Sequence, residues 1–170
     1  MNRKLLYTLL AVPALVLSVA LLVMVAVKYR YLPEVLPGVS LDGEPLMRSE
    51  LWVFVASAFL LSLAPLGSVY FPRLRRVNSG LRLKDIRQRG VPVMPRYELR
   101  FQLGLTATCF LLVLCFFCRC MVVLLPSGGG DWLYVLMAIA IAGAVASTAF
   151  TCYIARLNNR AYRSSKYDNQ

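Results

Sequence analysis

This chain has four apolar stretches that are each long enough to cross a lipid bilayer, and they restrict it to a membrane-spanning fold. They run from Leu5 to Val27, from Leu51 to Phe71, from Phe101 to Leu125 and from Trp132 to Ala155. A helix rises about 1.5 Å per residue, so roughly 20 apolar residues cross a hydrocarbon core of ~30 Å. The sequence therefore predicts one integral membrane domain over residues 1–170, an all-α bundle of four spanning helices.

The composition agrees with this fold class. Hydrophobic residues make up 59% of the chain, and its mean hydropathy is +0.63. A water-soluble domain of this size must give more of its surface to charged side chains. These values therefore exclude an ordinary soluble globular fold.

The distribution of positive charge predicts the orientation of the spans. Lys and Arg collect in the cytoplasmic loops of membrane proteins during insertion. Nine of the 19 Lys and Arg residues lie between Pro72 and Arg100, and others precede the first span or follow the fourth. With four spans, all three basic segments lie on one side. We therefore expect both termini and the 72–100 loop to be cytoplasmic, in the inner membrane of a bacterium.

The 72–100 loop has more positive charge than is needed to set the orientation of the spans. A short helix over residues 81–89 would place Leu83 and Ile86 near one side, and anionic lipid attracts each basic residue near the surface by about 1 kcal/mol. Nucleic-acid binding is disfavoured, because Tyr97 is the one aromatic residue available for stacking. We predict that the following residues lie along the lipid surface: Arg73, Arg75, Arg76, Arg82, Lys84, Arg87 and Arg89.

Small residues repeat at helical spacing in the fourth span. Ala138, Ala142 and Ala146 are four residues apart, and Gly143 with Ser147 extends this face toward Ala140, Ala144 and Thr148. Such repeats allow the backbones of membrane helices to approach closely. Two interpretations remain open. The repeat can pack inside the bundle, or it can form a seam that binds a partner.

Arg119 is the one charged residue well inside a predicted span. An unpaired guanidinium at the centre of a bilayer costs at least ~2.5 kcal/mol. One interpretation is structural: the side chain extends outward and pairs with Asp131 or Glu50. The other is functional, with Arg119 recognising an incoming partner helix.

Three cysteines near the outer end of the third span raise an enzymatic alternative. Cys115 and Cys118 form a C-x-x-C pair beside Cys120, and the four spans resemble the quinone-coupled disulfide-forming proteins of the DsbB and vitamin K epoxide reductase type. Those enzymes relay electrons between two cysteine pairs, one on an outer loop, whereas the 28–50 loop here has none. The chain also has no His, the commonest metal ligand and acid–base group. We predict no enzymatic activity, no metal and no cofactor.

The outer loop carries a resemblance of its own. Its Leu32-Pro33-Glu34-Val35-Leu36-Pro37 run, followed by Asp42-Gly43-Glu44-Pro45, is similar to the proline element after the first helix of SdpI-like bacterial toxin-immunity and signalling membrane proteins. The chain has Gly38 where that family has His. In size and topology the chain also resembles the four-span immunity proteins against pore-forming colicins.

These resemblances imply a protein that binds another membrane protein. Our first hypothesis is immunity against a pore-forming or membrane-targeted bacterial toxin, and the alternative is a small accessory subunit of a larger membrane complex. The residues predicted to contact the partner are charged residues at the outer side and the alanine repeat: Glu34, Asp42, Glu44, Glu50, Arg119, Asp131, Ala138, Ala142 and Ala146.

Overall fold

A computed structural model describes residues 3–39, 45–70, 97–125 and 130–167. Its long helices are α1 (Arg3–Lys28), α2 (Glu50–Tyr70), α5 (Tyr97–Leu124) and α6 (Gly130–Tyr167). Each of these is long and apolar enough to cross a membrane. The prediction of an all-α protein with four candidate spans is therefore confirmed.

Two boundaries differ from those predicted. Residues 97–100 were assigned to the basic loop but form the first turn of α5, where Tyr97 stacks on Phe101 with ring centroids 5.7 Å apart. The α6 helix continues past Ala155 to Tyr167. Tyr97 packs with Phe101 and with Ile154 of α6, so the added first turn of α5 buries an apolar side chain.

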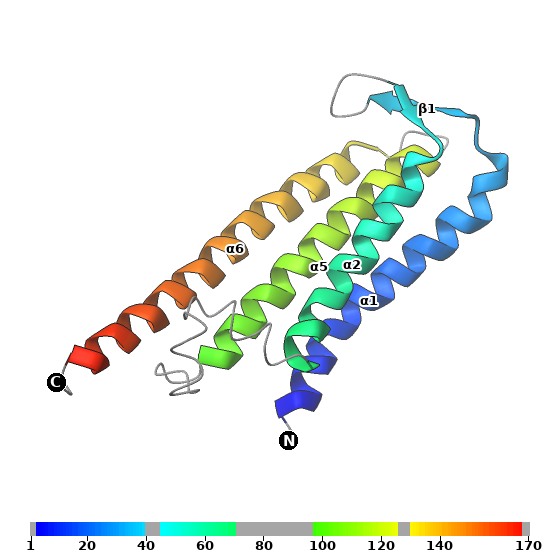
Figure 1. Ribbon diagram of the computed structural model, residues 1–170. Helices are drawn as coiled ribbons and strands as arrows, with labels where there is room; N and C mark the ends of the chain where they lie inside the picture. Colours follow the sequence, from blue (N-terminus) through cyan, green and yellow to red (C-terminus); the bar gives the residue numbers. More distant parts are fainter. Residues whose placement is uncertain (1–2, 40–44, 71–96, 126–129, 168–170) are drawn as a thin grey trace.

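The helices lie side by side in the order α6, α5, α2, α1 (Figure 1). Helix α5 packs against α1, α2 and α6, whereas α6 packs mainly on α5. The start of α1 and the end of α6 lie at the same end of the bundle (Figure 1), as an even number of spans requires.

The segment between α1 and α2 is folded rather than a plain connector, which the sequence did not predict. A short 3-10 helix, η1 (Tyr29–Tyr31), leads into strand β1 (Val35–Val39), which pairs antiparallel with β2 (Pro45–Met47). Val35 pairs with Met47 and Val39 with Pro45, with an irregularity between. This hairpin lies over one end of the bundle (Figure 1), here called the hairpin end.

Exposed aromatic residues mark where the bilayer surfaces fall. Trp and Tyr prefer the membrane–water interface. Trp52 and Tyr70 lie near opposite ends of α2, about 27 Å apart at 1.5 Å of rise per residue, and Trp132 and Tyr153 of α6 are about 31 Å apart. All four are exposed. Both separations match a hydrocarbon core of ~30 Å, so the hairpin lies outside the core.

Buried hydrogen bonds join α1, α2 and α5. The Ser18 hydroxyl of α1 donates to Ser62 of α2 over 3.2 Å. The Gln102 amide of α5 donates to the carbonyl of Pro65 over 3.0 Å, and its oxygen accepts from Ser68 over 2.7 Å. All of these side chains are buried. In lipid such bonds contribute about 0.6 kcal/mol each, and they fix the register of the three helices.

Candidate partner-binding site

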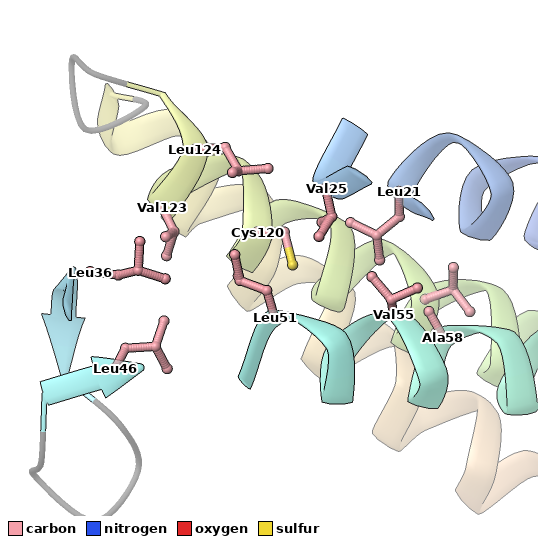
Figure 2. Close-up of a cluster of buried hydrophobic side chains, with 11 residues drawn as sticks. Leu21, Val25, Leu36, Leu46, Leu51, Val55, Ala58, Cys120, Val123 and Leu124 are labelled. Atoms are coloured by element: carbon pink, nitrogen blue, oxygen red, sulfur yellow. The ribbon is translucent and has the colours of Figure 1, made fainter. Parts of the chain in front are cut away.

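The hairpin closes the end of the bundle with one apolar face. Leu36 of β1 and Leu46 of β2 are buried in one cluster with Leu51 of α2 and Val123 and Leu124 of α5. Figure 2 shows both leucine side chains projecting toward the end of α5. Since side chains alternate between the faces of a strand, Val35 and Met47, which adjoin these leucines, point away from the bundle.

Arg48 joins the hairpin to the helices beside it. Its Nη1 donates to the carbonyl of Leu32 over 3.2 Å, and its backbone N–H donates to the carbonyl of Glu34 over 2.9 Å. The guanidinium lies 4.7 Å from the centre of the Tyr29 ring, which contacts Trp52 at 5.5 Å between centroids. Arg48, which lies between β2 and α2, is thus bound to η1 and to the residues that lead from η1 into β1.

Replacing Arg48 with Ala should loosen the hairpin without unfolding the bundle. We expect a loss of about 1–2 kcal/mol in stability, because the variant loses a charge-assisted hydrogen bond and a cation–π contact. Arg48→Lys should recover only part of the loss, since an ammonium cannot both stack on a ring and bond sideways. Hydrogen exchange of the hairpin amides measures the effect. Equal protection in Arg48→Ala and the parent would contradict this role.

Two apolar side chains of the hairpin strands, those of Val35 and Met47, are exposed. Val35 and Met47 are partners across the two strands, with 51% and 47% of their surfaces exposed, and Tyr31 of η1 is 86% exposed. We call Val35 and Met47 the hairpin patch. Two carboxylates lie near it in the sequence, on exposed Glu34 and half-buried Glu50. Exposed Lys28 and Arg30 are also near in the sequence, so a partner arriving at this end would meet apolar side chains and charges of both signs.

Hydrogen bonds between α5 and α6 give the depth of Arg119. The Thr108 and Ser147 hydroxyls are 2.8 Å apart, which fixes the register of these antiparallel helices. Arg119 lies about three turns beyond Thr108, level with Leu136 and about one turn inside Trp132. It is half-buried. At this depth the guanidinium can reach the interface along its own side chain, so recognition by Arg119 would take place near the membrane surface.

The remaining residues predicted for this site are more dispersed. Asp131 is exposed in the first turn of α6, and its pairing with Arg119 stays a prediction. Asp42 and Glu44 lie outside the described residues, as do all seven residues predicted for the lipid surface, Arg73, Arg75, Arg76, Arg82, Lys84, Arg87 and Arg89.

The cysteines of α5 are all free thiols. Cys120 is buried in the cluster that α5 forms with α1 and α2, whereas Cys118 is buried with Leu133 of α6. These two side chains therefore point to opposite sides of α5. Among the described residues, no group of three His, Cys, Asp or Glu side chains could hold a metal ion.

The alanine repeat of α6 does not face the bundle. Ala138, Ala142 and Ala146 are exposed, whereas Ala140 and Ala144 are buried against α5. The interpretation of internal packing is therefore wrong for Ala138, Ala142 and Ala146, and it is confirmed for Ala140 and Ala144. The sequence could not settle the choice, because alanines occur at every second position from 138 to 146 and so lie on several sides of the helix.

Comparison of the chain with protein-family models, with curated proteins and with solved structures finds no match in any of the three.

Proposed function

We propose that this four-span membrane protein works by binding another membrane protein, and that its role is immunity against a pore-forming or membrane-targeted bacterial toxin. The hairpin patch is the observation that carries the proposal. Val35 and Met47 are partners across the two strands and both are about half exposed, and neighbouring exposed apolar side chains favour a contact site. The patch lies at the end of the bundle that a toxin arriving from outside would reach first.

Two further features support this role. The proline element that resembles SdpI-like immunity proteins spans Leu32–Pro37 and supplies Val35 and Leu36 of the hairpin. The patch also rests on a fixed support, because Leu36 and Leu46 anchor the opposite face in the core. A preorganised surface loses less conformational entropy on binding than a flexible loop would. Toxin helices held at this end could not complete a conducting pore.

A test of this role needs variants that keep the fold. Met47→Asp and Val35→Asp place a charge on the exposed patch, and we expect each to abolish protection while leaving the protein abundant in the membrane. Ser49→Asp is the matched control, because Ser49 is exposed beside β2, off the patch, and Asp is well accepted at a helix start. A strain lacking the gene, complemented with each variant, is grown beside toxin-producing siblings while membrane potential is recorded. Full survival of the deletion strain, or of Met47→Asp, would contradict the proposal.

The open face of α6 favours a second candidate, an accessory subunit of a larger membrane complex. Only 17% of the apolar window of α6 is buried, against 39% for α5. An accessory subunit would use this face for a permanent partner. Purification in mild detergent from cells that make no toxin tests the second role. Companions at constant stoichiometry indicate a subunit, and the protein alone excludes one.

A further inference from the structure

One hydroxyl inside the bundle has no hydrogen-bond partner among the described residues. It belongs to Thr106 of α5, a side chain that is only 6% exposed. The other threonines of α5 and α6 differ, because Thr108, Thr148 and Thr151 each donate to the carbonyl four residues earlier in their own helix. The Thr106 hydroxyl is therefore turned away from its own helix. A buried polar group without a partner costs free energy.

A backbone carbonyl of α2 also lacks its usual donor. Pro65 has no N–H, so the carbonyl of Leu61 cannot accept the helical hydrogen bond from residue 65. The Pro65 side chain is fully buried, and its carbonyl accepts from the Gln102 amide of α5, so this side of α2 faces α5. Inside a membrane, a backbone carbonyl must find another donor.

The hydroxyl and the carbonyl lie at the same level of the bundle. Gln102 bonds both the Pro65 carbonyl and the Ser68 hydroxyl, which fixes the register of α5 on α2. These helices are antiparallel (Figure 1). Thr106 is one turn beyond Gln102, so it lies beside the turn of α2 that begins at Leu61.

Two serines supply further polar groups at this level. Ser62 follows Leu61, and its hydroxyl lies 3.2 Å from that of Ser18 on α1. Both side chains are fully buried. A buried water molecule needs two to four polar partners. Between α1, α2 and α5 it would donate to the Leu61 carbonyl and bond the Thr106 hydroxyl and the serine pair.

Polar side chains lead to this level from the end opposite the hairpin. Thr8 and Tyr70 lie there with their hydroxyls 3.3 Å apart, and the buried pair of Ser68 and Gln102 follows, 2.7 Å apart. On the hairpin side of this level, the described interior is an apolar cluster. Its members there include Leu21, Val25, Val55 and Val113.

We propose that α1, α2 and α5 hold a buried water molecule between the Thr106 hydroxyl and the Leu61 carbonyl, and that water reaches this site only from the end opposite the hairpin. Leu61 lies midway along α2 between Trp52 and Tyr70, so the site is near the middle of the membrane. It gives Thr106 a partner and satisfies the carbonyl that Pro65 frees. The site is independent of the proposed function.

Two buried cysteines of α5 test the site. Cys109 is three residues after Thr106 and so lies beside it on the helix, whereas Cys120 lies three turns further along the same side, in the apolar cluster. Both are at most 3% exposed. Brief X-ray irradiation of the full-length protein in phosphatidylcholine nanodiscs splits water into hydroxyl radicals, which oxidise adjacent thiols. Mass spectrometry then measures the oxidation of each cysteine.

We expect Cys109 to be oxidised and Cys120 to stay intact. Thr106→Val, which has nearly the same shape, should lose the oxidation of Cys109, and Thr106→Ser should keep it. Oxidation of Cys109 that persists in Thr106→Val would overturn the inference, as would an intact Cys109 in the parent. Equal oxidation of both cysteines would overturn the proposed route of entry.

Stability gives a second readout, because its direction depends on the water. Thr106→Val should unfold at a lower SDS content than the parent, since it displaces the water and leaves the Leu61 carbonyl without a donor. A hydroxyl that binds nothing predicts the opposite, because removing an unpaired buried polar group stabilises. Pro65→Ala restores the N–H to Leu61, so Thr106→Val should cost less in that background. A stabilised Thr106→Val, or an equal loss in both backgrounds, would contradict the bridge.

Discussion

Replacing Gly104 with Ala is expected to lower the free energy of unfolding by about 1–3 kcal/mol, the usual cost of overpacking a close contact. A Cβ at Gly104 would clash with Oγ1 of Thr151 and lie 3.3 Å from Cδ1 of Phe150 on α6. The threonine cannot simply turn away, because Oγ1 donates to the carbonyl of Ser147 over 2.8 Å and its χ1 angle is restricted. The helices must separate to admit the methyl group. Unfolding in mixed micelles of increasing SDS content measures the change.

Two other glycines in the spans provide graded controls. A Cβ at Gly143 would lie 3.0 Å from Cδ1 of Leu111, at the flexible end of that side chain, so Gly143→Ala should cost less. A Cβ at Gly67 meets nothing within 4 Å, and alanine has the higher helix propensity, so Gly67→Ala should be neutral or stabilise by up to about 1 kcal/mol. Equal effects at Gly104 and Gly67 would contradict the close approach of α5 and α6.

Truncating the buried side chains of the hairpin should destabilise it strongly, whereas truncating the exposed ones should change its stability little. Leu46→Ala or Leu36→Ala should destabilise the hairpin end by about 2–5 kcal/mol, because each removes a fully buried leucine from the cluster with Leu51 and Val123. Only 1–2% of the surface of either leucine is exposed. We expect the segment joining the helices to become sensitive to protease at concentrations that leave the parent intact.

Met47→Ala and Val35→Ala are the matched controls on the same strands. Their side chains are about half exposed, so truncation should change stability by roughly 0.5 kcal/mol or less. Rapid cleavage of Met47→Ala, or resistance of Leu46→Ala, would show that the hairpin does not rest on the bundle as described. Comparing Leu46→Ala with Met47→Ala also separates loss of folding from loss of partner binding at the patch.

The four spans could be predicted from the sequence because their apolar length alone sets the requirement for crossing a bilayer. The hairpin could not. Its strands are short, they contain Pro37 and Pro45, and they pair with an irregularity, so no regular alternation of five or more residues signals them. They are stabilised by burial of Leu36 and Leu46 against α5, a contact between segments far apart in the chain.

The candidate site was predicted only in part. The sequence predicts that Glu34, Glu50 and Asp131 lie at one end of the bundle, because each is next to the end of a span on that side. The apolar patch was missed, because Val35 and Met47 look like ordinary connector residues until strand pairing brings them together. Two contacts show which face of α6 packs on α5: the hydroxyls of Thr108 and Ser147 meet, and Thr151 lies close to Gly104. Hydroxyl residues beside a small-residue repeat are the sequence signal that could have identified this face.

The most direct test of this account is the side of the membrane on which each end of the bundle lies. Single cysteines are introduced at Tyr31 and at Arg160, both exposed, in a variant whose five native cysteines are replaced by Ala or Ser. Intact spheroplasts are then treated with a membrane-impermeant maleimide. The account predicts that the cysteine at position 31 is labelled at once and the cysteine at position 160 only after permeabilisation. Labelling of both in intact spheroplasts would contradict a four-span protein with its hairpin outside, and labelling of position 160 alone would reverse its orientation.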